Sequence, residues 1–199
     1  MSDPFAPGPQ AGGRGPAPGR LGLVQAFVNS HFSLEAERGA DLLASPAGLA
    51  AWLEARGLAP GRVTDAERQR ALTLREGLRA QLAAHAGARP APDPAAALAE
   101  AARGLSVGYA VGPEGATAPV VDGPGVAGAL GLVLAVVHEA QVAGTWPRLK
   151  ACPGDHCGWA FYDASRNAAG TWCSMRVCGG RAKARAHRRR AGGAAVTGR

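Results

Sequence analysis

The amino-acid sequence predicts an α+β protein, in which a mostly helical N-terminal domain with one β-hairpin precedes a small cysteine-rich module with a basic helix. Three observations carry this prediction. Apolar residues recur at helical spacing through much of residues 20–147, a strand-like alternation occurs at 105–111, and all four cysteines of the 199-residue chain lie within 152–178.

The segment before the first helix is rich in Pro and Gly. Residues 1–19 hold almost no bulky apolar side chains, so we expect a disordered leader there. The segment also lacks the apolar run of a signal peptide, and we therefore expect the protein to be cytoplasmic, in a reducing compartment. Leu21–Phe32 is the first predicted core helix because its apolar residues follow a helical period, and Glu35–Leu43 is expected to be a polar linker or short extension.

Capping signals position the next two helices. Ser45 suits an N-cap, and the proline that follows it suits the first helical position, so a helix is predicted at 46–55. Thr64 and Glu67 have the spacing of a capping box at the start of a long amphipathic helix, Asp65–His85.

Residues beyond this helix predict one hairpin between two helices. After a Pro/Ala spacer we expect a short helix at Ala95–Gly104, then a strand at Leu105–Val111, a turn, and a returning strand at Ala116–Val121. Val126–His138 is apolar nearly all round, which predicts a buried helix that continues to Gly144. Its twelve apolar residues are fewer than the roughly 20 that a membrane span needs, so we expect no membrane association.

The four cysteines form the pattern C-x4-C-x15-C-x4-C: Cys152, Cys157, Cys173 and Cys178. Two short chelating loops of this kind suit one tetrahedral Zn2+. Free thiols and two disulfides are the alternatives, and disulfides would be the default in a small secreted domain. We prefer a structural zinc, one per chain, because no signal peptide is visible and because four cysteine ligands leave no open position for catalysis.

Three aromatic residues lie between the two cysteine pairs: Trp159, Phe161 and Tyr162. We expect them to form the small core that so short a module needs. The alternative is that one ring faces outward and stacks on a nucleic-acid base.

Positive charge is concentrated after the last cysteine. From residue 148 to the end, eleven Lys/Arg oppose two acids, whereas residues 1–147 hold eleven Lys/Arg and thirteen acids. If a helix begins after the glycine pair 179–180, Arg181, Arg185 and Arg188 share one face. Lys183, His187 and Arg190 are expected to form a second cationic line beside that face.

A solvated basic tail is the simplest interpretation of such a run, but its position next to the cysteines favours double-stranded DNA as the partner. The expected contacts with phosphates or groove edges come from the basic helix and from two loop residues: Arg181, Lys183, Arg185, Arg188, Arg166 and Arg176. Single-stranded RNA is a third possibility, favoured only if an aromatic ring is exposed.

The region around the cysteines resembles the CGNR zinc finger, whose hallmark is Cys-Gly-Asn-Arg-Ala-Lys followed by a basic helix. The corresponding residues here are 178–183, with Gly180 in place of the family's Asn. Residues 148–150, 165–167 and 172–175 match as well. The resemblance implies a treble-clef-like or ribbon zinc finger that binds DNA.

The N-terminal part resembles the ABATE domain of bacterial stress-induced transcription regulators. The match rests on Leu21–Ser30, with Gln25 where an acid is usual, on Leu49–Leu58, and on the hairpin followed by an apolar helix. It implies an α+β sensor or dimerisation domain, hence an unknown small-molecule effector and a homodimer. The expected division is a leader at 1–19, the ABATE-like domain at 20–147, the finger at 148–191 and a disordered tail at 192–199.

The sequence therefore predicts a zinc-dependent DNA-binding transcription regulator. The alternative is a ligand-sensing or protein-interaction module whose zinc finger is purely structural and whose basic helix docks on an acidic protein. We do not expect an enzyme, because dinucleotide-binding, P-loop, G-x-S-x-G and H-E-x-x-H motifs are all absent from the sequence. We interpret the pair His138-Glu139 as a helix end that reaches solvent.

Overall fold

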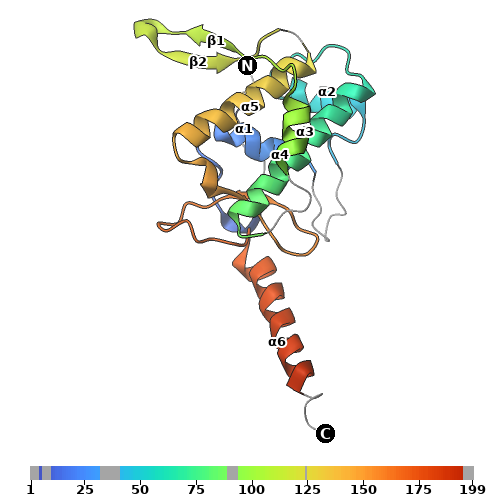
Figure 1. Cartoon of the computed structure of the whole chain (residues 1–199), viewed down its shortest axis with the longest axis vertical. Helices are drawn as coiled ribbons and strands as arrows, with labels where there is room; N and C mark the ends of the chain where they lie inside the picture. Colours follow the sequence, from blue (N-terminus) through green and yellow to red (C-terminus); the bar gives the residue numbers. More distant parts are fainter. Residues whose placement is uncertain (1–4, 6–9, 32–40, 89–93, 124, 195–199) are drawn as a thin grey trace.

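The computed structural model describes residues 5, 10–31, 41–88, 94–123 and 125–194. A helical body carries a β-hairpin at one end and a long helix at the other (Figure 1). The helices are α1 (Leu21–Val28), α2 (Pro46–Glu54), α3 (Asp65–His85), α4 (Pro94–Ala102), α5 (Val126–Val142) and α6 (Gly180–Ala194). The strands form two antiparallel hairpins, β1 (Gly108–Val111) with β2 (Thr117–Val120), and β3 (Leu149–Ala151) with β4 (Ala160–Tyr162).

Both predicted caps are formed, and they explain where α2 and α3 begin. The Ser45 hydroxyl accepts a hydrogen bond from the Gly48 amide at 3.0 Å. At the start of α3, the Thr64 hydroxyl accepts from the Glu67 amide while the Glu67 carboxylate accepts from the Thr64 amide at 2.8 Å. Each cap satisfies amides that the first helical turn leaves without an intrahelical partner.

The core lies around α1, all eight residues of which are buried. Phe27 of this helix meets Trp52 of α2 edge to face, with ring centroids 5.6 Å apart. As predicted, α5 is buried on nearly every side and runs past residue 138. No helix in the described part of the chain combines the length and the apolar character that crossing a bilayer requires.

The first helix is shorter than predicted. It ends at Val28 because Asn29 leaves the helical conformation and commits its side chain to another segment, and Phe32 lies outside the described residues. Of the predicted linker, residues 35–40 also lie outside them, while Leu43 is fully buried.

The first strand begins at Gly108 rather than Leu105. The carbonyl oxygen of Ser106 lies so close to α5 that a Cβ at Gly131 would clash with it. The chain therefore packs its backbone on α5 at this point and pairs with β2 only afterwards. The hairpin then leaves the body, which exposes Tyr109 and Val111.

The N-terminal segment differs from the expected leader, because parts of residues 10–19 pack on the rest of the protein. Ala17 is 3% exposed, and its amide donates to the buried Gln25 side chain at 2.7 Å. Gly12 approaches the cysteine-rich module so closely that a Cβ would lie 2.7 Å from that of Ser174. At the other end, α6 continues through the first three residues of the expected tail, 192–194. The domain boundaries themselves stay a prediction.

Candidate metal centre and basic helix

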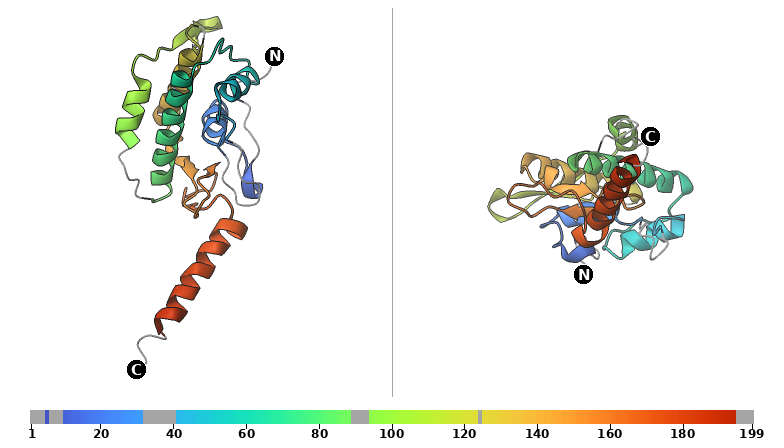
Figure 2. Two further views of the ribbon diagram at one scale, coloured as in Figure 1. Left: turned by 90° about the vertical axis from the view of Figure 1, so that its right-hand side faces the viewer. Right: turned by 90° about the horizontal axis from the view of Figure 1, so that it is seen from below.

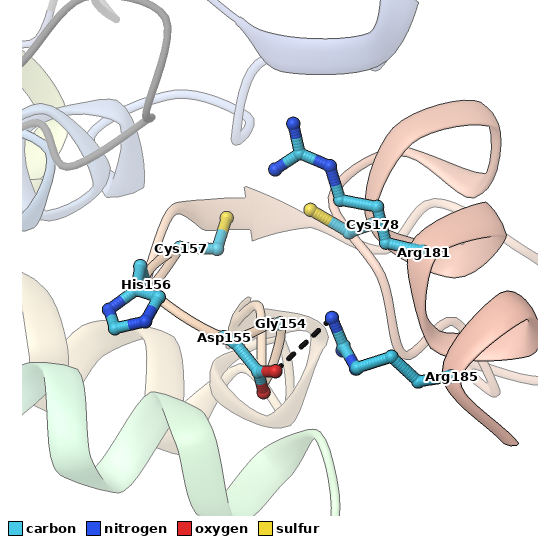
Figure 3. Close-up of a pocket in the computed structure, with 7 residues that line it drawn as sticks. All are labelled: Gly154, Asp155, His156, Cys157, Cys178, Arg181 and Arg185. Atoms are coloured by element: carbon cyan, nitrogen blue, oxygen red, sulfur yellow. Dashed lines mark ion pairs between the residues drawn. The ribbon is translucent and has the colours of Figure 1, made fainter. Parts of the chain in front are cut away.

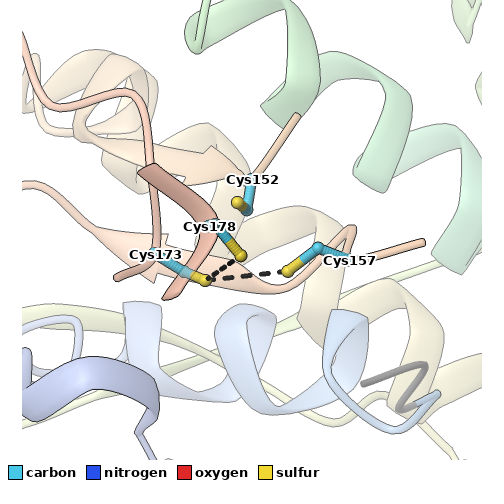
Figure 4. A group of neighbouring side chains, drawn as sticks. All are labelled: Cys152, Cys157, Cys173 and Cys178. Carbon is cyan, nitrogen blue, oxygen red and sulfur yellow. Dashed lines mark hydrogen bonds between the residues drawn. The ribbon is translucent and has the colours of Figure 1, made fainter. Parts of the chain in front are cut away.

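The four cysteines converge on one buried point (Figure 4). Their Sγ atoms all lie within 4.8 Å of one another. Cys173 Sγ is 3.6 Å from Cys157 Sγ and 3.7 Å from Cys178 Sγ. A tetrahedral ion with Zn–S bonds of ~2.3 Å requires S···S edges of ~3.8 Å, so the sulfurs fit one zinc. The thiols are free, and their separations far exceed the ~2.05 Å of a disulfide bond.

The first cysteine pair belongs to the turn between β3 and β4. Cys152 donates its amide to the Trp159 carbonyl at 2.9 Å, and Cys157 donates to Gly154 at 2.9 Å. A side chain at Gly154 would be crowded, because a Cβ there would lie 3.3 Å from Cys178 Sγ and 3.4 Å from Cys152 Sγ. Gly158 takes a φ of +59°, which favours glycine.

The second pair lies at the root of the basic helix. Cys178 sits in a π-helical turn, Met175–Gly179, that runs directly into α6. Ser174 caps this turn by accepting a hydrogen bond from the Val177 amide at 3.2 Å. The helix α6 begins at Gly180, within one residue of the expected start, but it continues the π-helical turn, so Gly180 is in helical conformation with φ −61° and ψ −47°.

Burial and close contact between the sulfurs give the four thiols different pKa values. Hydrogen bonds from the Cys157 and Cys173 thiols, helped by backbone amides, lower the pKa of Cys152 to about 2. The same contact with Cys152 raises the pKa of Cys157 to about 12, and it raises that of Cys173 as well. Burial raises the pKa of Cys178. A divalent cation would supply the charge that allows all four sulfurs to bind as thiolates.

A buried ion pair holds the loop that leads to the third cysteine. Lys150 Nζ lies 3.0 Å from Asp163 Oδ2, with 5% and 0% of the two side chains exposed. The carboxylate also accepts from the Ser165 hydroxyl at 2.7 Å and from the Gly170 amide at 2.6 Å. Burial alone would raise the pKa of Asp163, but these donors hold it far below its usual range. Arg148 donates hydrogen bonds to the carbonyls of Asp163 and Ser165 at 3.0 and 2.8 Å. Arg148, Lys150 and Ser165, which belong to the segments that resemble the CGNR zinc finger, therefore hold the loop in place.

Two of the three aromatic residues form the predicted small core, whereas Tyr162 is partly buried and packs against the core of the helical body. Trp159 and Phe161 are 3% and 1% exposed and pack with the cysteines, which leaves neither ring open for base stacking. Arg14 covers Phe161, with its guanidinium 4.4 Å from the ring centroid. It also donates to the Trp172 carbonyl at 2.7 Å and to that of Cys173 at 3.1 Å. Sequence reasoning missed Arg14, because it lies 159 positions from Cys173 in a Pro/Gly-rich run.

The module shares the core of the helical body. Asn29 exchanges two hydrogen bonds with the backbone of Ala160, at 2.9 and 2.7 Å. Arg79 of α3 donates to the Gly158 carbonyl at 2.6 Å, and His85 contacts the Leu149 carbonyl at 2.8 Å. These contacts fix the orientation of the four cysteines relative to α1 and α3.

The predicted contact residues are spread over the basic helix and two other segments. Arg181, Lys183 and Arg188 are exposed on α6, Arg176 is exposed in the π-helical turn, and Arg166 is exposed in the loop after β4. Arg185 is held by an ion pair, since its Nη1 lies 3.1 Å from Asp155 Oδ2. Arg181 and Arg185 line a small pocket over the first cysteine turn (Figure 3).

The fold and the site define a zinc-finger protein with a closed, structural site of four cysteines. Comparison with family models matches residues 148–191 to the CGNR zinc finger and residues 21–156 to ABATE, described as "Putative stress-induced transcription regulator". The second match covers more than half of the chain, so the protein belongs to the ABATE family. Both resemblances and their order are confirmed, and one zinc ion per chain is the cofactor. None of the curated proteins compared matches this chain.

Proposed function

We propose that the protein is a transcription regulator that binds double-stranded DNA through α6. The observation that carries this proposal is that α6 projects from the body with most of its cationic side chains exposed, while Cys178 anchors its root to the zinc site (Figure 2). Like charges this dense destabilise a helix unless an anionic partner relieves them. The family description supports a regulator.

We further propose that the N-terminal part receives the regulatory input. Residues 20–147 would bind a small-molecule effector and would supply the homodimer that a two-fold symmetric DNA site requires. Because four cysteines fill the zinc coordination, we propose no catalytic step. A cytoplasmic location follows from the same proposal, since DNA is the partner.

The test is duplex-DNA binding by the intact, zinc-loaded chain over a salt series. If about five phosphates are neutralised, affinity falls roughly two to three decades between 50 and 200 mM salt. The variant R181A/R185A/R188A should flatten this dependence, whereas R62A/R103A, which removes exposed charge from the body, should not. Negligible binding by a chain that carries one zinc would contradict the proposal. Equal competition by heparin and by every duplex would favour docking of α6 on an acidic protein surface.

A further inference from the structure

Most cationic residues of α6 lie on two opposite faces of the helix, and Arg189 lies on the flank between them. Successive residues turn by about 100°, so Lys183 lies about 200° from Arg181, and Arg190 lies about 180° from it. The expectation that the second line lies beside the first is therefore wrong. The first face comprises Arg181, Arg185 and Arg188, and the second face comprises Lys183, His187 and Arg190.

Both faces carry exposed side chains. Arg181 and Arg188 are exposed on the first face, and Lys183, His187 and Arg190 are exposed on the second. The first face is turned toward the first cysteine turn, because Arg185 pairs with Asp155 there. The helix otherwise stands clear of the body in two perpendicular views (Figures 1 and 2).

A helix with cations on opposite sides is complementary to an anion that flanks it on both sides. A flat phosphate surface would contact only one face. The major groove of B-form DNA is about 12 Å wide, accommodates a helix about 10–12 Å across, and has a phosphate backbone along each wall. The minor groove of about 6 Å is too narrow, and side chains cannot read the deep major groove of A-form RNA.

We propose that α6 enters the major groove of B-form DNA, with its first face on the phosphates of one strand and its second face on those of the other. This inference rests on the proposed DNA binding. From Arg181 to Arg190 the helix rises about 13.5 Å, which corresponds to about four base pairs. The strand on the side of the first face passes next to the first cysteine turn.

One flank between the two faces is suited to the floor of the groove. It carries the small residues Ala182 and Ala186 at about 100° and 140° from Arg181, with Arg189 at about 80°. Alanines allow a close approach to base edges, and an arginine among them can donate two hydrogen bonds to a guanine. Arg189, which was absent from the expected contacts, is thereby assigned as the residue that determines sequence preference.

The first experiment compares two variants that each remove two charges, R181A/R188A from the first face and K183A/R190A from the second. Zinc-loaded full-length protein is titrated on a non-palindromic duplex selected for tight binding, and contacts are mapped by phosphate-ethylation interference on each strand. Each variant should lower the salt slope by about 1.8, and each should remove interference from a different strand. Loss from the same strand in both variants would overturn the two-faced arrangement.

Two further readouts separate this inference from the proposed function. A duplex RNA of the same sequence should bind far more weakly than the DNA, and a minor-groove ligand should not compete. R189K, which keeps the charge but loses the two-pronged donor, should leave the salt slope unchanged and reduce the preference for the selected sequence about tenfold or more. Tight binding that survives a major-groove blocker but not a minor-groove ligand would overturn the inference alone. Absence of any DNA binding would overturn both proposals.

Discussion

The buried pair of Lys150 and Asp163 allows the sharpest prediction about the stability of the zinc module. Asp163 is completely buried and accepts hydrogen bonds from Ser165, Gly170 and Lys150, at distances of 2.6–3.1 Å. Lys150 also donates to the carbonyls of Ala168 and Gly170. Asp163→Asn keeps the shape of the side chain but leaves the ammonium group buried without a counter-charge.

The expected cost of that substitution is about 3–5 kcal/mol, the range observed when one partner of a buried ion pair is removed. In a protein of this size, each kcal/mol lowers the melting temperature by about 2–4 °C, so Tm should fall by roughly 6–20 °C. Thermal and urea unfolding of the zinc-loaded chain, followed by circular dichroism, measure both quantities.

The double variant K150M/D163N provides the control. It removes both charges, so its loss should be smaller, by about 1 kcal/mol or more, than the sum of the losses in K150M and D163N. Additive losses would show that the two groups do not interact. A loss below about 1 kcal/mol in D163N alone would refute the structural role of the pair.

Three other predictions concern pH, DNA affinity and the glycine at the family's Asn position. The pKa of Asp163 is lowered in the folded protein, so its contribution to stability is full above the unfolded-state pKa of about 4 and is lost as pH falls below that value. Unfolding measured at about pH 2–7 will show this loss, and D163N should abolish the contribution of Asp163. Asp155→Asn should raise DNA affinity a few-fold, because Arg185 then no longer has to leave its ion pair with Asp155 to contact a phosphate. Unchanged or weaker binding would contradict this. Gly180→Asn should not lower the melting temperature. The Cβ of the new side chain would meet only the Met175 carbonyl, at 3.8 Å, and glycine is itself a poor helix former. A fall in Tm of more than about 3 °C would refute this.

Local signals in the sequence were sufficient to predict the caps and the metal ligands. Ser45 and Thr64 each cap a helix by accepting a hydrogen bond from the amide three residues further along the chain. The spacing of the cysteines determines almost directly that they converge. The family resemblance added the order of the two domains, which the comparisons confirm. These features depend on short stretches of chain, where residue type and spacing carry the structural information.

Long-range contacts could not be predicted in the same way. Arg14 reaches Cys173 and Asn29 reaches Ala160 across more than 130 residues, and nothing near either residue indicates its partner. The length of the first strand was overestimated because the alternation at 105–107 also suits a segment that packs on α5. The glycine pair predicted the start of α6 to within one residue, but the π-helical turn that Ser174 caps and that carries Cys178 into the helix was not predicted.

We propose that one zinc ion, held by four cysteines, fixes the root of a DNA-binding helix. A chelator titration of the intact chain, with zinc content and duplex-DNA affinity recorded in the same samples, tests this proposal. We expect one zinc per chain at the start and a loss of DNA affinity in proportion to the zinc removed. A metal-free chain that binds the same duplex with unchanged affinity and salt dependence would contradict it.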